Sequence, residues 1–245
     1  MKKVYDTINQ YCVEHELLTN GDGIVIGLSG GMDSVCLLQV LAALRNEWQL
    51  RLVCVHVHHG IRGTAADEDA AFAQRLAAKY NISFRLYEMD IPQLAKEQGL
   101  SEEEAGRNYR YRCFEEVRKE LNFDKIAVAH HRDDQAETVL WQILRGSGLR
   151  GVCGMRAGRA NIIRPLLCLD RQQIEQIVRG NGDGWREDAT NREEKYTRNK
   201  IRNRVFPYIE QEIQPMARRH LVELAEDCQR AWDYIERQML EQYER

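Results

Sequence analysis

Short runs of β-branched and apolar residues recur along the chain and alternate with segments whose apolar residues return every three or four positions. The runs are GIVIGL at 23–28, LRLVCVHV at 50–57, ISFRLYEM at 82–89, DKIAVAH at 124–130 and a weaker NIIRPL at 161–166. The helical patterns cover 34–46, 67–80, 101–121 and 134–144. Alternation of near-continuous apolar strands with helices is typical of a parallel sheet covered on both faces. We therefore predict an α/β fold with a parallel five-stranded sheet.

The helix expected at 101–121 is the best specified. Ser101 and Glu104 have the spacing of a capping box, which fixes its start. An apolar stripe with a spacing of four residues marks its buried side: Ala105, Tyr109, Cys113, Val117 and Leu121. The stripe leaves Arg107 and Arg110 on another face, where they are available to a ligand.

The character of the chain changes after about residue 167, where a charged stretch rich in Arg and Asn follows a helix and a Gly-rich break. Residues 215–245 have the pattern of one amphipathic helix. We predict a main domain at 1–210 and a helical extension or linker at 211–245. The last helix has no capping glycine, which leaves open both a complete chain and the catalytic part of a longer enzyme.

Composition narrows the class of protein. The 245 residues are 43% hydrophobic and 30% charged with a net charge of −3, so any nucleic-acid-binding surface must be local. Seven cysteines without a CxxC pair are typical of reduced thiols in a cytosolic protein. The N-terminal segment is too polar for a secretion signal, and no run approaches the roughly 20 apolar residues of a membrane span. We expect a cytoplasmic protein with a core of ordinary size.

The stretch SGGMDS at 29–34 follows the first strand and opens a helix, which is where backbone N–H groups and a helix N-terminus bind an anion. Gly30 and Gly31 permit close backbone approach, and the hydroxyls of Ser29 and Ser34 add donors. The lysine of the common phosphate loop is absent, and the acidic Asp33 favours phosphates that arrive with Mg²⁺. The alternative is a strand-to-helix turn in which Asp33 caps the helix.

A second candidate centre is HHRDDQAET at 130–138, after the strand expected at 124–130. A helix that starts here places Asp134 and Glu137 one turn apart on the same side. Together with Asp33 they could share a Mg²⁺ at the carboxyl edge of the sheet. The alternative is that Asp133 and Asp134 serve only as N-terminal helix caps.

Histidines and arginines supply further candidates. HVHH at 56–59 and HH at 130–131 lack the partners of a recognised zinc site, so we expect His59 and His131 to bind nucleotide or phosphate. The loop GSGLRG at 146–151 follows Arg145 and contains Arg150. The densest basic stretch is RNKIRNR at 198–204, which is either a solvated helix face or a surface for a nucleic-acid backbone.

The signature SGGxDS resembles that of the N-type ATP pyrophosphatases, the PP-loop family. Within it, six further segments resemble tRNA(Ile)-lysidine synthetases: HVHHGIRGTAADEDAAF, EEEAGRNYRYRCF, AHHRDDQAETVLWQILRGSGLRGVCGM, IIRPLL, WREDATN and YTRNKIRNRVFP. The resemblance covers about residues 20–215. The chain departs from it at His58, Gly106 and the pair Ala189 and Thr190, and none of these removes an indispensable chemical group.

The resemblance implies a Rossmann-like, adenine nucleotide alpha hydrolase-like fold and a ligase that turns the wobble cytidine of tRNA(Ile) into lysidine with ATP and L-lysine. The implied ATP-binding residues are Ser29, Gly30, Gly31, Met32, Asp33, Ser34, His59 and His131. The implied catalytic residues are Asp33, Asp134, Glu137 and Arg110, with Asp33 and Asp134 as ligands of Mg²⁺. The implied substrate and tRNA contacts are Arg107, Arg145, Arg150, Asn199 and Arg202. The implied partners are the anticodon loop, free L-lysine and a second copy of the chain.

Two other functions remain open. A PP-loop tRNA thiolase has a similar fold, but those with a cluster show a CxxC where this chain has NYRYRCF, with Cys113 alone. A non-catalytic ATP-binding module would release no pyrophosphate in the presence of lysine and tRNA. That module would also leave RGSGLRG and RNKIRNR without a role.

Overall fold

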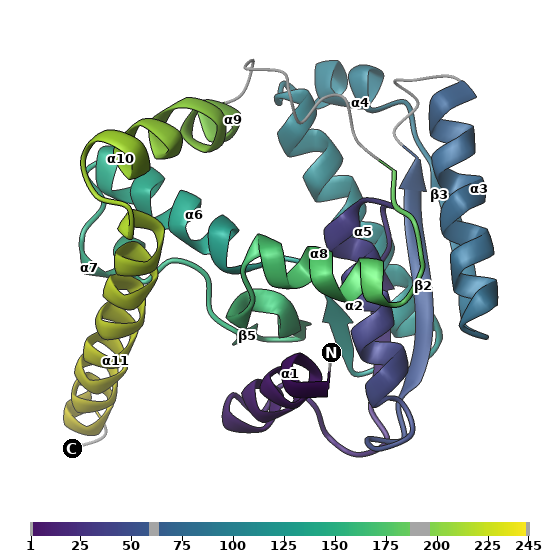
Figure 1. The fold of residues 1–245 in the computed structure, drawn as a ribbon, viewed down its shortest axis with the longest axis horizontal. Coiled ribbons are helices and arrows are strands. Elements are labelled where there is room, and N and C mark those ends of the chain that lie inside the picture. The colour runs from purple at the N-terminus through teal and green to yellow at the C-terminus, as the bar shows by residue number, and fades with distance from the viewer. Residues whose placement is uncertain (1, 59–63, 187–196, 244–245) are drawn as a thin grey trace. The chain divides into compact units, whose positions relative to one another are not determined.

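The computed structural model describes residues 2–58, 64–186 and 197–243 (Figure 1). The chain forms two compact units, each made of two separate stretches. Unit 1 contains residues 1–129 and 157–187, and unit 2 contains residues 130–156 and 188–245. The domain boundary expected at residue 210 stays a prediction.

Six strands form one sheet in the described part of unit 1, in the order β3-β2-β1-β4-β6-β5. The strands are β1 Gly23–Gly27, β2 Arg51–His58, β3 Ser83–Glu88, β4 Lys125–Ala127, β5 Gly158–Arg159 and β6 Ile162–Ile163. All neighbours pair in parallel except β5, which is antiparallel to β6. The predicted parallel sheet is confirmed, with β5 as an added edge strand that is too short to leave a pattern in the sequence.

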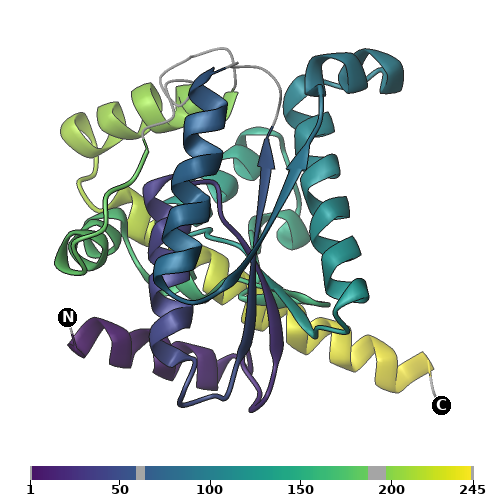
Figure 2. The same cartoon turned by 90° about the vertical axis from the view of Figure 1, so that its right-hand side faces the viewer.

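Helices cover both faces of this sheet, as predicted (Figure 2). The helices of unit 1 are α1 Lys2–Glu14, α2 Met32–Leu44, α3 Thr64–Lys79, α4 Ile91–Gln98, α5 Glu102–Glu120 and α8 Arg171–Gly180, with the 3-10 helix η1 at Pro165–Cys168. Successive residues of β1 enter different cores, because side chains alternate along a strand. Ile24 and Ile26 pack with α2 and α8, whereas Val25 packs with α5.

Unit 2 is helical in its described residues. Its helices are α6 Arg132–Leu144, α7 Leu149–Val152, α9 Thr197–Lys200, the π-helix η3 Ile201–Val205, α10 Phe206–Glu212 and α11 Ala217–Tyr243. A small core joins α6, η3, α10 and α11 through Ala136, Ile201, Phe206 and Val222. This core holds η3 against α6, which positions the polar residues described below. The predicted C-terminal helix is confirmed as α11.

Candidate functional site

The loop after β1 has the backbone of an anion-binding turn. Gly30 is buried and has a φ of +89°, a conformation that side chains with a Cβ rarely adopt. The hydroxyl of Ser34 donates to the carbonyl oxygen of Gly31 at 2.8 Å and accepts from the N–H of Gly30 at 3.1 Å. Ser29 and Ser34 are joined through their hydroxyls at 3.1 Å. The serines predicted as phosphate donors therefore also fix the loop.

The helix α2 starts directly behind this loop. Gly31 is its N-cap residue, so the capping role considered for Asp33 belongs to the glycine. Asp33 lies in the first turn. The first N–H groups of a helix have no partner within the helix and carry partial positive charge. The loop and the start of α2 thus form a site suited to phosphate groups, and Asp33 lies beside it as one carboxylate.

Other candidates of unit 1 have different surroundings. Nδ1 of the buried His56 contacts the carbonyl oxygen of Leu28 at 2.8 Å, and burial is the main cause that lowers the pKa of His56. His56 therefore joins β2 to the end of β1. Arg107 and Arg110 are exposed on α5, off its buried stripe, as predicted. His59 lies outside the described residues.

In unit 2, the helix α6 begins with a reciprocal cap. The N–H of Asp133 donates to Nδ1 of His131 at 3.3 Å, and the N–H of His131 donates to Oδ2 of Asp134 at 3.0 Å. Nε2 of His131 also lies 3.4 Å from Oδ2 of Asp134. The capping alternative is thus correct in part, because Asp134 belongs to the cap and also has further partners.

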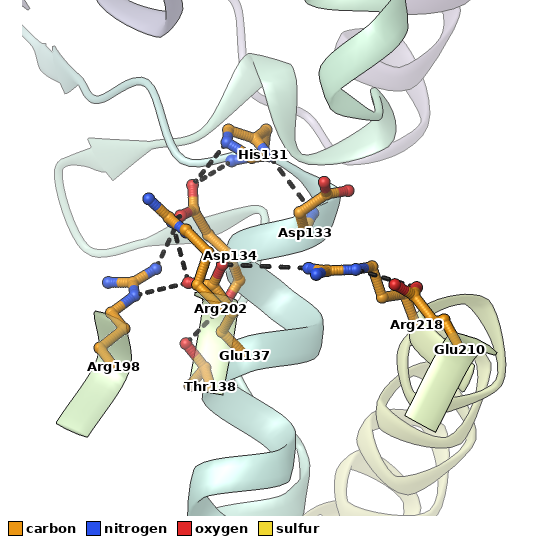
Figure 3. A network of polar contacts seen from close by, with 9 residues as sticks. All are labelled: His131, Asp133, Asp134, Glu137, Thr138, Arg198, Arg202, Glu210 and Arg218. Atoms are coloured by element: carbon orange, nitrogen blue, oxygen red, sulfur yellow. Dashed lines mark hydrogen bonds and ion pairs between the residues drawn. The ribbon is translucent and has the colours of Figure 1, made fainter. Parts of the chain in front are cut away.

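Two arginines bind the carboxylates of α6 (Figure 3). Nη2 of Arg198 and Nη2 of Arg202 donate to Oδ1 of Asp134 at 2.8 and 2.9 Å. Nε of Arg198 donates to Oε2 of Glu137 at 2.9 Å, and Nε of Arg202 donates to Oε1 at 2.6 Å. We call these four residues the carboxylate–arginine cluster. It confirms that Asp134 and Glu137 face the same side.

The carboxylates of this cluster are shielded from solvent more than its arginines. The side chain of Glu137 is fully buried and that of Asp134 is 11% exposed, whereas those of Arg198 and Arg202 are 36% and 28% exposed. Burial alone opposes ionisation of Asp134, but the positive charges of His131, Arg198, His130 and Arg202 outweigh it and lower its pKa to about 2. Asp134 is therefore ionised at neutral pH.

The remaining candidates of unit 2 lie nearer the surface. Arg145 at the end of α6 and Arg150 on α7 are both exposed and lie over the rings of Trp141 and Trp232. Asn199 lies on α9 and is partly buried. The sequence pattern marks Arg198 only as part of the basic stretch at 198–204 and not as a partner of the carboxylates, although its spacing of four residues from Arg202 in a helix places both on one face.

No group of three or more His, Cys, Asp or Glu residues within 2–58, 64–186 and 197–243 is arranged to hold a metal ion. Asp33 belongs to unit 1 and Asp134 belongs to unit 2, and the Mg²⁺ that they are expected to share stays a prediction. No helix in the described part of the chain is long and apolar enough to cross a membrane. All seven cysteines are described, and none forms a disulfide.

Comparison with known proteins identifies relatives for almost the entire chain. The sequence model of the PP-loop domain family matches residues 2–209. A tRNA(Ile)-lysidine synthase of Caldanaerobacter subterraneus is 45% identical over 241 residues, which are 96% of this chain and 50% of the relative. One from Clostridium perfringens is 41% identical over 239 residues, or 97% of this chain and 50% of the relative. The chain thus spans about half the length of these relatives.

Solved structures of similar fold include a U34-tRNA thiolase of Methanococcus maripaludis, with a TM-score of 0.73 at 18% identity, covering 92% of this chain and 77% of that one. An NH3-dependent NAD synthetase of Campylobacter jejuni has a TM-score of 0.52 at 16% identity and covers 94% of this chain and 93% of that one. At these identities the likeness concerns the fold alone.

Proposed function

Because the chain belongs to the PP-loop domain family, we propose that it is the ATP-using part of an enzyme that converts the wobble cytidine of tRNA(Ile) to lysidine. The observation that carries this proposal is the identity of 45% to a tRNA(Ile)-lysidine synthase over 96% of the chain. A substrate of this kind also implies a cytoplasmic location. A homodimer stays a prediction.

The first step joins the cytidine to AMP. The O2 atom of the base attacks the α-phosphorus of ATP, and pyrophosphate leaves with the electrons of the broken P–O bond. Charge therefore grows on pyrophosphate as the bond breaks. The N–H groups of the loop at 29–34 and the start of α2 are suited to stabilise that charge. Arg110, exposed on α5, is the proposed arginine for the same charge or for the activated base.

Mg²⁺ fits the first step through one carboxylate. This cation binds one or two carboxylates and completes its shell with phosphate oxygens and water. Asp33, in the first turn of α2, meets that requirement. Asp134 meets it less well, because its Oδ1 already accepts hydrogen bonds from two guanidinium groups. When bound, Mg²⁺ would neutralise charge on the phosphates.

In the second step the ε-amine of lysine attacks C2 of the adenylated cytidine, and AMP leaves with the former O2. The amine must be neutral to attack, so one proton has to be removed. A carboxylate with a pKa of about 2 is a poor base, so we assign Asp134 the task of holding positive charge. Glu137 stays the other candidate for binding the ammonium or taking its proton, although both of its carboxylate oxygens also accept from guanidinium groups.

We assign Arg107, Arg145, Arg150 and Asn199 to contacts with the tRNA or the base. Exposed arginines are suited to phosphates of the anticodon loop, where each adds a salt-dependent contribution to affinity. The role predicted for Arg202 on the tRNA backbone stays a prediction. Its guanidinium is held by Asp134 and Glu137, which favours a task in ordering these carboxylates.

The thiolase alternative lacks support from Cys113. This cysteine is buried in the core of α5, and burial raises its pKa, so it is neither accessible nor readily ionised. The proposal is tested by incubating the protein with labelled lysine, ATP, Mg²⁺ and tRNA(Ile). Lysine incorporation that requires ATP supports it. Pyrophosphate release without lysine incorporation would instead favour another PP-loop reaction.

A further inference from the structure

The segment from Asn181 to Arg186, which we call the strap, forms hydrogen bonds and ion pairs with the helices around the loop at 29–34. We call residues 29–34 the ATP loop. The side-chain amide of Asn181 donates to the hydroxyl of Tyr5 at 2.9 Å and to Oε1 of Gln39 at 3.1 Å. The strap therefore begins with polar contacts to α1 and α2, although it follows α8 in the chain.

Asp183 is the second fastening point of the strap. It is buried and accepts from Nε2 of Gln39 at 2.7 Å and from the hydroxyl of Tyr80 at 2.5 Å. Lys79, the last residue of α3, also binds its carboxylate. A buried carboxylate with three donors is costly to move, because each lost partner leaves charge without compensation. This point fixes the strap to the C-terminal end of α3.

Arg186 is the third fastening point and contacts the ATP loop itself. Its backbone N–H donates to the carbonyl oxygen of Gly30 at 2.9 Å. Its guanidinium donates from Nε to Oδ1 of Asp69 at 2.8 Å and from Nη2 to Oε2 of Glu68 at 2.7 Å. Both acids lie on α3. One residue thus joins the loop to the N-terminal half of α3.

The hydrogen bond to Gly30 sets the direction of a neighbouring donor. The carbonyl of Gly30 and the N–H of Gly31 belong to one planar trans peptide, so they point in opposite directions. Holding the carbonyl oxygen toward Arg186 turns the N–H of Gly31 to the other side. There, among the residues that the structure describes, it makes only a long contact of 3.4 Å with Oγ of Ser29. A phosphate oxygen is a stronger acceptor than a hydroxyl.

Helix α3, which carries Glu68 and Asp69, packs against Gly30, so the ion pairs of Arg186 with these acids bear on the position of the Gly30 peptide. A Cβ placed on Gly30 would lie 3.4 Å from Cδ1 of Phe72 and 3.7 Å from the carbonyl oxygen of Asp69. The second turn of α3 therefore lies directly against the loop. A shift of α3 or of Arg186 would let the Gly30 peptide rotate, since glycine tolerates many backbone angles.

We propose that Arg186 is a positioning residue for the ATP loop, which orients the Gly31 N–H toward pyrophosphate through its ion pairs with Asp69 and Glu68. The inference rests on the proposed use of this loop for the phosphates of ATP. It differs from a direct phosphate contact of Arg186, because the guanidinium is already shared by two carboxylates.

The test uses Arg186→Ala, Asp69→Asn and their double variant, with Arg85→Ala as the matched control. Arg85 forms a similar ion pair with Glu120 in unit 1 and is 48% exposed, against 41% for Arg186. Affinity for inorganic pyrophosphate, ATP and AMP is measured by calorimetry. Amide hydrogen exchange is measured for the peptide that covers 29–35. Melting temperature reports on folding.

Both single variants should weaken pyrophosphate and ATP binding by about threefold to tenfold and leave AMP binding unchanged. The double variant should bind pyrophosphate no more weakly than Arg186→Ala does, because both changes remove the same ion pair. Exchange in the loop should rise in these variants and stay unchanged in Arg85→Ala. Arg186→Lys should restore part of the affinity, since lysine keeps the charge without the planar fork.

Two results would overturn the inference. If Asp69→Asn leaves or improves pyrophosphate affinity while Arg186→Ala lowers it, Arg186 is a direct phosphate ligand. If Arg186→Ala behaves like Arg85→Ala in binding and exchange, the strap does not position the loop. Lysine incorporation into tRNA is scored separately. The expected variant effects without incorporation would support the strap and refute the proposed enzyme.

Discussion

Nε of Arg202 donates a hydrogen bond to Oε1 of Glu137 at 2.6 Å, although the two residues lie 65 positions apart in the chain. The contact joins η3 to the buried side of α6, where Glu137 has no exposure to solvent. A buried carboxylate requires compensation by hydrogen bonds and opposite charge. Arg202 therefore contributes to the fold of unit 2 as well as to its candidate site.

Removal of Arg202 should destabilise unit 2. We expect Arg202→Ala to lower the free energy of unfolding by about 1–3 kcal/mol, because the buried Glu137 and Asp134 lose a charged donor while Arg198 remains. Urea denaturation measures the change. Arg219→Ala is the control, since Arg219 is 66% exposed and pairs only at the surface with Glu223. If Arg202→Ala lowers the free energy of unfolding no more than Arg219→Ala does, Arg202 does not stabilise unit 2.

The pKa of Asp134 predicts a pH dependence. Its folded value of about 2 lies below the ordinary 3.8. The unfolded chain therefore binds more protons as pH falls between these values. The contribution, about 2 kcal/mol, is fully present above the ordinary pKa and is lost as pH falls toward 2.

For each protein the unfolding free energy between pH 5 and pH 3 is compared with that protein's own value at pH 6. The loss should be smaller in Asp134→Asn than in the natural chain. Urea denaturation across this pH range measures the slope. Asp227→Asn serves as the control, because the side chain of Asp227 is 66% exposed. An identical slope in Asp134→Asn and the natural chain would show that the native pKa of Asp134 is not depressed.

The left-handed backbone of Gly30 predicts a combined loss of stability and ATP binding. Gly30→Ala should cost about 1–2 kcal/mol of unfolding free energy, because φ is +89°. It should also weaken ATP affinity by distorting the loop. Gly99→Ala is a matched control, with φ of +65° and open space around it. Gly99→Ala should lose similar stability but retain ATP affinity; loss of ATP affinity in both would refute a local effect.

The arginines around GSGLRG should affect tRNA and leave ATP binding unchanged. Arg145→Ala and Arg150→Ala should each weaken tRNA binding and reduce the slope of log affinity against log salt concentration by about 1. Filter binding over a salt series measures both effects, with Arg219→Ala as control. A salt slope unchanged in both variants would remove these residues from the tRNA surface.

The local features of the fold were predictable because they depend on neighbouring residues. Strand β1, the loop at 29–34 and the start of α5 follow from apolar runs, glycines and a cap, and Ser101 does accept from the N–H of Glu104 at 3.2 Å. Helix α4 was missed, although Asp90 as N-cap, Pro92 and Gly99 gave its start and end. Strand β5 has two residues, too few for a period.

The contacts between distant segments were not predictable from periodicity. The pairs Arg198 with Asp134 and Arg186 with Asp69 join residues 64 and 117 positions apart, and no local pattern records them. The apolar positions at 215–245 that predict the last helix are buried only in part. Leu221 packs against the small core of unit 2, but Leu224 and Met239 are exposed, whereas Val222 and Ala225 are buried, because packing on α6 selects the face.

In the proposed reaction this chain takes part in joining lysine to a cytidine of tRNA(Ile). The most direct measurement is mass spectrometry of nucleosides from tRNA(Ile) after incubation with the protein, ATP, Mg²⁺ and L-lysine. We expect a nucleoside with the mass of cytidine plus lysine minus one water at the wobble position, absent without ATP and without protein. Unmodified cytidine there, with tRNA bound and ATP consumed, would refute the proposed function.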